Sequence, residues 1–481
     1  MKFNKLVASA AILAWASAAN ATETLSMWYH GAGNEVELKL INEVIADFNA
    51  AQADWKVELQ TFPQAAYNDS VVAGALAGNL PDILDVDGPV MPNWAWAGYM
   101  QPLKIDESKI ANFLPGTKGI WNGQLYSIGL WDAAIALTTR QSILDELGLR
   151  KPTVDAPWTK DEFMAALDAA KASGKYEFAL DLGTAWTGEW YPYAFSPLMQ
   201  SFGGDIVDRS TYKTAEGALN GEAAQAFGAW WQGLFTGGYA QSTQDGADRD
   251  SGFASGKYAF SPLMQSFGGD IVDRSTYKTA EGALNGEAAQ EFGAWWQGLF
   301  TGGYAQATQD GADRDSGFAS GKYAFSWNGN WAALGALSAH PDTVFLPPPD
   351  LGNGPKIGAA SWQFGVSATS KFPEGAAAFI EFALDDKYLA AFSNGIGLIP
   401  ATPTAAEMVD NYKAGGPLAD FVTYSSKFGM VRPVTPGYVV QAKVFEKALA
   451  DIAQGADVAA TLDAAVDEIN ADIEKNSGYG H

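Results

Sequence analysis

Residues 24–89 have the sequence TLSMWYHGAGNEVELKLINEVIADFNAAQADWKVELQTFPQAAYNDSVVAGALAGNLPDILDVDGP. Short apolar runs in this stretch alternate with helical patterns, and the runs predict strands at residues 24–29, 55–59 and 82–86. A helix starting near Asn34 places Ile41, Val44, Ile45 and Phe48 on one face. A second helix, capped by Asp69, is expected to reach Leu76. The order strand–helix–strand–helix–strand predicts a parallel, doubly wound α/β sheet.

Ligands of such sheets bind beyond the carboxyl ends of the strands. His30, Asp85 and Asp87 lie at the ends of two predicted strands, so we expect them at a binding site. Glu35 lies at the following turn and is a further candidate. Its alternative role is to favour the start of its helix, where the helix dipole is positive.

One passage of the chain is written twice. Residues 193–257 recur as 258–322, and the two 65-residue copies differ only at Ala226/Glu291 and Ser242/Ala307. Repeat architectures have diverged units in three or more copies, because each unit needs neighbours to bury its apolar face. We therefore interpret the second passage as a recombination product, or as an error of sequence assembly, within a parental chain of 416 residues.

The sequence YAFS begins both copies and occurs a third time at residues 323–326, before WNGN. Before PLMQ it is expected to be helical or loop, and before WNGN it is expected to be a strand. The middle YAFS, residues 258–261, follows ASGK, as the expected strand does, but precedes PLMQ, as the expected helix or loop does. We expect one copy to occupy the native positions, with Trp230/Trp231 and Trp295/Trp296 competing for one helical place and about 65 residues forming an insert. A displaced apolar helix would favour self-association.

The N-terminus has the pattern of a secretory signal peptide over residues 1–21. Lys2 and Lys5 precede an apolar run, and Ala19-Asn20-Ala21 forms a cleavage site. No later stretch is long and apolar enough to be a membrane span, so the mature chain is expected to be free in the compartment beyond the membrane. A chain of this length is also long for one core, which predicts two lobes.

Composition excludes several classes of site. The chain has no cysteine, so disulfides, thiolate metal sites and a lipid-bearing cysteine are excluded. Three histidines make no convincing metal site, and no cofactor motif is present, so we expect neither metal nor cofactor. The net charge of −25 repels nucleic acid and anionic lipid, so neither is an expected partner.

Several motifs in succession resemble one known family. They are WYHGAGNEVE, FPQAAYNDSVVAGALAGNLPDILDVDGP, NWAWAGYMQPL, FASGKYAFSWNGNW, AASWQFGVSATSK and VRPVTPGYVVQAKVFEKALADIAQGADVAATLDAAVDEI. In this order they are similar to the extracellular solute-binding proteins of carbohydrate ABC transporters, over the whole mature chain except the extra copy.

The resemblance implies two α/β lobes, each a mostly parallel sheet flanked by helices, that close on a sugar. The chain would cross between the lobes near residues 129–133, 345–348 and 399–403. Lobe 1 would comprise residues 22–131 and 347–400, and lobe 2 would comprise residues 132–346 and 401–481, including both copies. The resemblance also implies a periplasmic location, a membrane permease as partner, and a monomer unless the repeat drives self-association.

Tryptophans are the expected sugar-stacking groups, because an indole covers the apolar face of a sugar ring while polar side chains bind its hydroxyls. Trp331 and Trp362 lie in the loop-like contexts GNW and ASWQF, where the resemblance also places stacking aromatics. The other candidates for ligand contact are Trp28, Trp131, Asp132, Glu189, Trp190 and Asn328. The alternative for each tryptophan is core packing, and the alternative for Asp132 is binding to backbone amides of the hinge.

Two other classes of function are open on the sequence alone. A secreted glycoside hydrolase needs a carboxylate pair around a sugar cleft, and 55 acidic residues supply many pairs without any specific motif. A repeat-mediated interaction protein rests on the duplication alone. Within the binding class, a polyamine, a peptide or a metal ion is an alternative ligand, whereas the tryptophan content favours a sugar.

Overall fold

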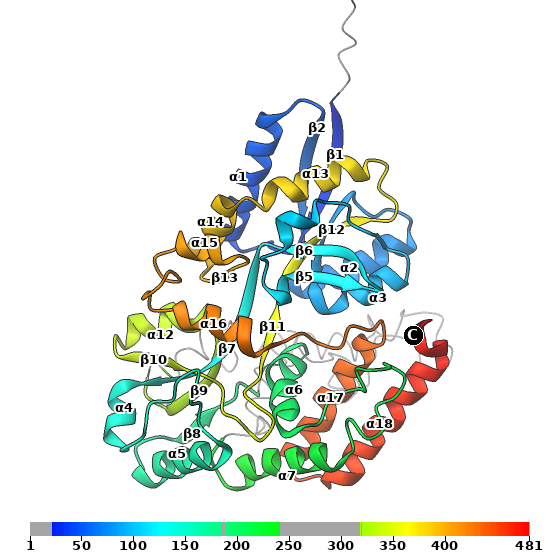
Figure 1. The fold of residues 1–481 in the computed structure, drawn as a ribbon. Coiled ribbons are helices and arrows are strands. Elements are labelled where there is room, and N and C mark those ends of the chain that lie inside the picture. Colours follow the sequence, from blue (N-terminus) through cyan, green and yellow to red (C-terminus); the bar gives the residue numbers. More distant parts are fainter. Residues whose placement is uncertain (1–21, 185, 187, 241–317, 319, 481) are drawn as a thin grey trace, which may run out of the picture.

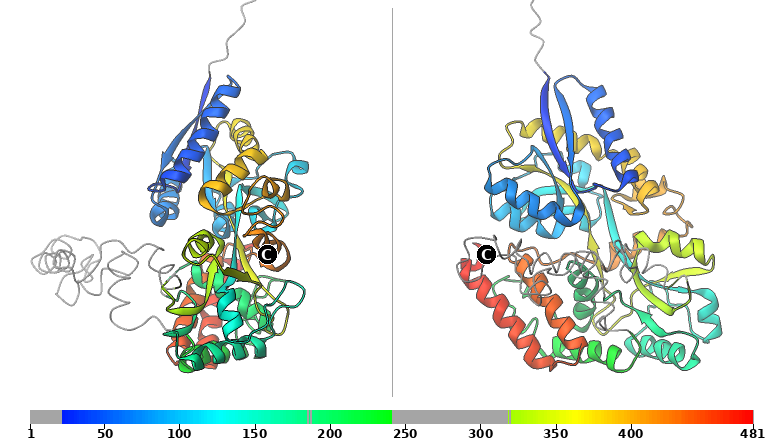
Figure 2. Two further views of the ribbon diagram at one scale, coloured as in Figure 1. Left: turned by 90° about the vertical axis from the view of Figure 1, so that its left-hand side faces the viewer. Right: turned by 180° about the vertical axis from the view of Figure 1, so that it is seen from behind.

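The computed structural model describes residues 22–184, 186, 188–240, 318 and 320–480. These residues form two α/β lobes, one above the other in Figure 1, and the lobes meet at a narrow waist that is also visible from the other two sides in Figure 2. Each lobe has its own sheet and its own buried core.

Lobe 1 is built on a sheet with the strand order β2-β1-β3-β12-β6-β5, with β4 paired to β12. The strands are β1 (Glu23–Tyr29), β2 (Trp55–Thr61), β3 (Ile83–Asp87), β4 (Met100–Gln101), β5 (Lys118–Trp121), β6 (Gln124–Gly129) and β12 (Trp362–Ser367). The first three strands are parallel to one another, as the sequence predicts. β12 returns to this sheet from the other lobe and runs antiparallel to both of its neighbours.

Helices cover both faces of this sheet. They are α1 (Glu35–Ala51), α2 (Gln64–Leu76), α3 (Met91–Trp96), α13 (Pro373–Ala383) and α14 (Asp386–Ile396). α1 buries Ile41, Val44, Ile45 and Phe48, the face expected from their spacing. α2 begins five residues before the expected cap Asp69, because Pro63 supplies a start with a fixed backbone angle.

Lobe 2 is built around the long strand β7 (Trp131–Arg140). β7 pairs with four antiparallel strands, β9 (Tyr323–Gly329), β10 (Thr343–Leu346), β11 (Ile357–Ala360) and β13 (Ile399–Pro400). Two parallel pairs complete the sheet, β9 with β8 (Phe178–Asp181) and β11 with β14 (Gly429–Met430).

The core of lobe 2 lies between this sheet and a set of helices. They are α4 (Gln141–Glu146), α5 (Lys160–Ser173), α6 (Trp190–Phe202), α7 (Glu222–Thr236), α12 (Ala333–Ala339), α16 (Ala419–Phe428), α17 (Tyr438–Ala453) and α18 (Val458–Lys475). α15 (Pro403–Glu407) lies beside the third crossing. Thr159 caps α5 through a reciprocal bond with Glu162, which fixes where that helix begins.

The two-lobed α/β class is confirmed, but the expectation of mostly parallel sheets is wrong. Four of the six strand pairs are antiparallel in the lobe 1 sheet, and four of six are antiparallel in the lobe 2 sheet. The physical reason is the crossings: a strand that re-enters a sheet from the opposite lobe arrives at the carboxyl edge and must run against the parallel strands.

The chain passes from one sheet to the other at three places. The chain passes from β6 to β7 at Leu130 and from β11 to β12 at Ser361, and it returns through β13. The first and third lie where the resemblance placed them. The second was expected near residues 345–348, but residues 357–360 still pair with β7, so the sheet boundary lies some thirteen residues later. The triple-proline segment 347–349 leads from β10 towards β11 within lobe 2.

Residues 193–240 of the first copy lie in lobe 2, and the described residues of the second copy, Phe318 and 320–322, directly precede β9. Tyr193 is helical in α6 and Tyr323 begins the strand β9, as expected for both contexts. α6 starts at Trp190, three residues before the first copy begins at Tyr193. The second copy could supply the rest of α6 only if the helix were interrupted after Pro192. Trp231 of α7 is fully buried, whereas Trp295 and Trp296 lie outside the described residues.

Deletion of residues 258–322 is expected to leave a protein at least as stable as the full chain. The described residues of the second copy, Phe318 and 320–322, would be replaced by identical residues 65 positions earlier. Deletion of residues 193–257 is the matched control. It yields the same chain apart from two positions, of which Ala226 is exposed on α7, so the two forms should agree within about 0.5 kcal/mol. Urea unfolding measures both, and loss of cooperative unfolding in the first form would contradict the prediction.

Candidate functional site

A buried charged array lies at the carboxyl ends of β1 and β3, where the sequence predicts a site. The Nδ1 atom of His30 contacts Asp85 Oδ2, and its Nε2 atom lies 3.4 Å from Glu37 Oε1 of α1. The Tyr29 hydroxyl donates to the same Glu37 oxygen at 2.5 Å, and Asn34 Nδ2 donates to Glu37 Oε2 at 2.9 Å. His30, Asp85 and Glu37 are all buried. The site therefore begins with a histidine held between two carboxylates.

Trp362 lies directly against this array. Its indole stacks on the His30 imidazole with ring centroids 3.8 Å apart and an interplanar angle of 11°. Tyr67 of α2 meets the indole nearly at right angles, at 5.7 Å. Trp362 is the first residue of β12 after the second crossing and is half-buried, so part of its ring remains accessible at the edge of lobe 1.

Charged groups from both lobes meet next to this edge. Arg432 of lobe 2 is buried, and its Nε atom lies 2.7 Å from Glu189 Oε1. Glu189 Oε2 accepts from the Tyr438 hydroxyl at 2.6 Å. Asp87, at the end of β3 in lobe 1, interacts electrostatically with Glu189, Arg432 and His30. Asp87 and Glu189, both expected site residues, thus interact electrostatically across the lobes.

Asp87 is the carboxylate of this group without a partner. Among the described residues, no hydrogen bond or ion pair involves its side chain. Burial and the nearby Glu189 raise the pKa of Asp87 from 3.8 to about 7, although Arg432 and His30 oppose the shift. A group that donates hydrogen bonds to Asp87 would therefore be stabilised at this point between the lobes.

Aromatic rings of lobe 2 form a second surface, around Trp331. This half-buried indole lies 6.4 Å from Trp186 in a stacked arrangement, 6.2 Å from Trp190 and 6.1 Å from Tyr193. Its ring lies over the Cα atom of Gly329, where a Cβ atom would come within 2.2 Å of the indole. Gly329 is therefore required for this position of Trp331.

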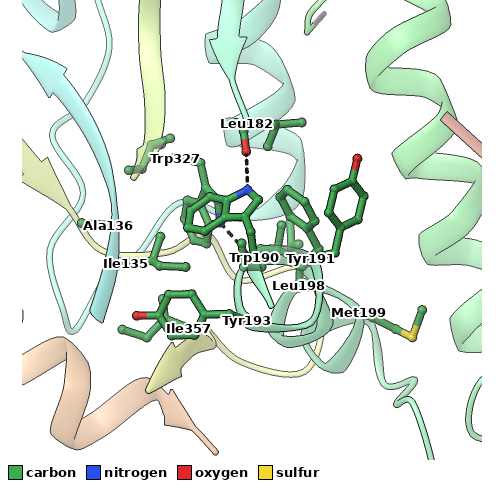
Figure 3. Close-up of a cluster of buried hydrophobic side chains, with 14 of the residues drawn as sticks. Ile135, Ala136, Leu182, Trp190, Tyr191, Tyr193, Leu198, Met199, Trp327 and Ile357 are labelled. Carbon is green, nitrogen blue, oxygen red and sulfur yellow. Dashed lines mark hydrogen bonds between the residues drawn. The ribbon is translucent and has the colours of Figure 1, made fainter. Parts of the chain in front are cut away.

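Trp190 and Trp131 are removed from the candidate set. Figure 3 shows Trp190 inside the core of lobe 2, and its Nε1 atom donates to the Leu182 carbonyl at 3.1 Å. Trp131 is buried in the lobe 1 core and stacks on Phe392 at 5.0 Å. Both indoles pack into the cores of the two lobes, which is the alternative that the sequence left open for each tryptophan.

Asp132 is likewise removed, because it binds the hinge. It is fully buried, its Oδ1 atom accepts from the Ala133 and Ala360 amides at 2.9 Å each, and its Oδ2 atom accepts from the Ser425 hydroxyl at 2.5 Å. This is the alternative role that the sequence left open. One carboxylate thus joins β7, β11 and α16 at the waist of the molecule.

Three further candidates lie apart from this group. Trp28 packs on Phe62 and on Gly74 of α2, and Glu35 is exposed in the first turn of α1, where Asn34 rather than Glu35 caps the helix. Asn328 is buried and borders a cavity of only about 10 Å³. We propose no ligand contact for these three.

A cavity of about 210 Å³ lies between the lobes next to the charged group. Its wall consists of Gly88, Pro89, Met91, Pro92, Pro115, Gly116 and residues 118–120 of lobe 1, residues 359–361 and Gln363 around the second crossing, and residues 431–434 of lobe 2. Gly88 follows Asp87 directly, and Arg432 belongs both to the wall and to the charged group. The space between the lobes is therefore bounded by polar groups of both.

Four residues of this site were missed by the sequence analysis: Glu37, Trp186, Arg432 and Tyr438. Glu37 is an acidic residue on an otherwise apolar helix face, which is a usable sign of a buried polar contact. Arg432 follows β14, some 240 residues from its partner Glu189, and no local pattern connects the two.

Two lobes joined by three crossings of the chain, with a cavity between them bordered by Arg432, have the architecture of a protein that binds a ligand between its lobes. The chain belongs to the bacterial extracellular solute-binding protein family, whose model matches residues 43–304 and 263–417. The two matched stretches overlap at residues 263–304, within the second copy.

Individual relatives are more distant. An uncharacterized lipoprotein in the oleD 5′ region of Streptomyces antibioticus is 25% identical over 240 residues, or 48% of this chain and 51% of the relative, so the chain matches about half of that relative's length. The sugar-binding protein MalE of Xanthomonas citri shares the fold with a TM-score of 0.65, 16% identity, and coverage of 94% of this chain and 98% of the other. The substrate-binding protein Lmo0181 of Listeria monocytogenes, solved with cycloalternan, has a TM-score of 0.65, 15% identity, and coverage of 94% and 99%.

The family places the protein outside the cytoplasm as a solute-binding protein. Within the described residues, no helix combines the length and apolarity that a membrane span needs.

Proposed function

We propose that this protein binds a sugar or oligosaccharide between its lobes and delivers it to the membrane permease of an ABC importer. The observation that carries the proposal is the half-buried indole of Trp362, which lies next to Asp87 in the β12–β3 ladder, together with a second half-buried indole, Trp331, in lobe 2. Trp362 accompanies Asp87 on lobe 1, and Trp331 lies on the lobe that contributes Glu189. An indole provides an apolar surface for a sugar ring, and carboxylates accept hydrogen bonds from its hydroxyls.

Closure would complete the site, because Asp87 and Trp362 belong to lobe 1 whereas Trp331, Glu189 and Arg432 belong to lobe 2. A sugar that contacts both sets would bind the closed arrangement more tightly than open ones. This difference in affinity would shift the population of the protein towards the closed arrangement. The crossings at Leu130, Ser361 and β13 are the places where the backbone would turn.

The named relatives support a sugar as ligand, since MalE of Xanthomonas citri is described as sugar-binding and Lmo0181 was solved with cycloalternan. The signal-like residues 1–21 and the absence of cysteine support a free protein of the periplasm. We also propose that the sugar is released unchanged, because Glu189 and Asp85 are engaged by Arg432, Tyr438 and His30 rather than arranged as an acid and a base.

A thermal-shift titration with maltose, maltotetraose and cycloalternan tests the function. A sugar at 100 times its dissociation constant should add about 2.7 kcal/mol to the free energy of unfolding, or roughly 2 °C or more in Tm. The sugar should be recovered intact. Cleavage would instead support a hydrolase, and the absence of a shift in both the full chain and the 416-residue form would contradict carbohydrate binding.

Substitution of Trp331 by alanine is expected to weaken binding of the sugar with the largest thermal shift by about fivefold or more, because a stacked indole contributes about 1 kcal/mol or more to such a contact. Trp55→Ala is the matched control, since Trp55 is also half-buried but packs on Phe372 at the far end of lobe 1. Isothermal titration calorimetry compares the two variants. Equal affinity for both would contradict the assignment of Trp331.

A further inference from the structure

In the Glu37–His30–Asp85 array, the His30 side chain has more polar partners than a buried imidazole needs to satisfy its hydrogen-bonding groups. Both ring nitrogens of His30 face carboxylates, and its backbone N–H also donates to Asp85 Oδ2 at 3.2 Å. Glu37 is in turn fixed by Tyr29 and Asn34. Such bonds fix the ring plane of the imidazole, because both nitrogens have defined partners on opposite sides of the ring.

The ring plane of His30 determines where the Trp362 indole can lie. A centroid separation of 3.8 Å at 11° is close contact over the whole ring, and Tyr67 closes the indole from another side. Trp362 is the first residue of β12, and its backbone is already paired with Asp87 of β3, so the contact with His30 acts on the direction of the indole rather than on the backbone. The fixed imidazole provides a flat support that belongs to lobe 1 alone.

We propose that His30 is a positioning residue that holds the Trp362 indole against lobe 1, so that one ring face is covered and only the remaining ring surface meets the sugar. The inference rests on the proposed function for the identity of the ligand. The stack is a contact between two side chains of this chain and can be tested by itself.

The charge of His30 strengthens this support. Burial alone would lower the pKa of His30, but the charge and hydrogen bond of Asp85, together with Glu37 and Asp87, raise it above the ordinary 6.5. The titratable groups facing the imidazole are Tyr29, Glu37, Asp85 and Asp87. An imidazolium over an indole also gains cation–π attraction. Since the pKa is raised, the charged stack is present below pH 6.5 and is lost as the pH rises through the raised pKa.

The first test is NMR of the full chain labelled with ¹³Cε1-histidine, which has three histidines in all. Assignment uses His30→Gln and, as the matched control, His340→Gln. The His30 signal should be displaced upfield by the ring current of the indole, should return to an ordinary position in Trp362→Leu, and should titrate with a midpoint above 6.5. A His30 signal without the Trp362-dependent displacement, or with a midpoint below 6.5, would overturn the proposal.

The second test is the pH profile of binding between pH 5.5 and 9, with maltotetraose as the probe. Affinity of the wild type should fall about threefold or more as His30 loses its proton, and His340→Gln should behave like the wild type. His30→Gln should bind weakly and should lack this fall, so that the pH dependence left in this variant is the one contributed by Asp87, whose pKa is raised to about 7. Binding whose pH profile is the same in His30→Gln would overturn the role of His30. If the wild type binds no sugar at any pH, the proposed function fails, and the NMR result still decides whether His30 positions the ring.

Discussion

Arg432→Met is expected to lower the free energy of unfolding by about 3 kcal/mol and to weaken sugar binding. The guanidinium is buried, its Nε atom pairs with Glu189, its Nη1 atom donates to the Ala359 carbonyl at 2.8 Å, and it lies 4.7 Å from the centre of the Tyr193 ring. Breaking a fully buried ion pair costs about 3–5 kcal/mol, and the lower end applies because the Glu189 side chain is 36% exposed.

Binding suffers because Arg432 is the cation between two carboxylates of opposite lobes. Without it, Asp87 and Glu189 repel each other as the lobes approach, so closure is disfavoured. Adding Glu189→Gln to Arg432→Met should restore part of the stability, because the uncompensated charge is then absent. Chemical denaturation of the two single variants and the double variant measures this coupling. Additive effects of the two substitutions would show that the ion pair does not contribute to stability.

Asp132→Ala is expected to be about 3 kcal/mol less stable than Asp132→Asn. Alanine leaves the Ala133 and Ala360 amides and the Ser425 hydroxyl without an acceptor at the waist, and each buried unsatisfied donor costs about 1–3 kcal/mol. Asparagine keeps Oδ1 for the two amides, and its amide group can donate to the Ser425 oxygen in return. Urea unfolding of both variants gives the difference, and equal stabilities would contradict the hinge role of Asp132.

The wild type and Asp132→Asn are also expected to differ in how their free energy of unfolding depends on pH. Burial raises the pKa of Asp132 from 3.8 to about 6, although the bonds from Ser425, Ala133 and Ala360 oppose this. The folded state therefore binds this proton more tightly than the unfolded state, so the contribution of Asp132 to stability falls as the pH rises from about 4 to 6. Asp132→Asn should lack this component. A difference between wild type and Asp132→Asn that is constant over this range would contradict the assignment.

Local sequence patterns were sufficient to predict the helices, strands and buried faces of much of lobe 1. The spacing of Ile41, Val44, Ile45 and Phe48 predicts the buried face of α1, and the runs ending at Tyr29 and Val86 predict β1 and β3 to within a residue. The start of α2 was missed because Pro63 rather than a polar cap begins that helix. The position of His30, Asp85 and Asp87 at one edge follows from the rule that parallel strands share their carboxyl ends.

The tryptophans show where such reasoning fails. Trp190, Trp331 and Trp362 were all candidates for sugar contact, yet Trp190 is buried in the core of lobe 2 while the other two are half-buried. Exposure of an indole depends on which helix or strand packs against it, and those partners come from remote parts of the chain. Residue type alone therefore proposes candidates but does not separate a packing indole from a binding one.

The sequence by itself determined the α/β class, the strand ends that carry His30 and Asp87, the repeat, and the resemblance to a solute-binding family, because periodicity and motif order are properties of neighbouring residues. Only the tertiary structure decided that residues up to Ala360 belong to lobe 2, that Asp132 binds the hinge, and that Glu189 pairs with Arg432. Those outcomes depend on distances between segments some 230 or more positions apart, and such distances exist only once both lobes have packed.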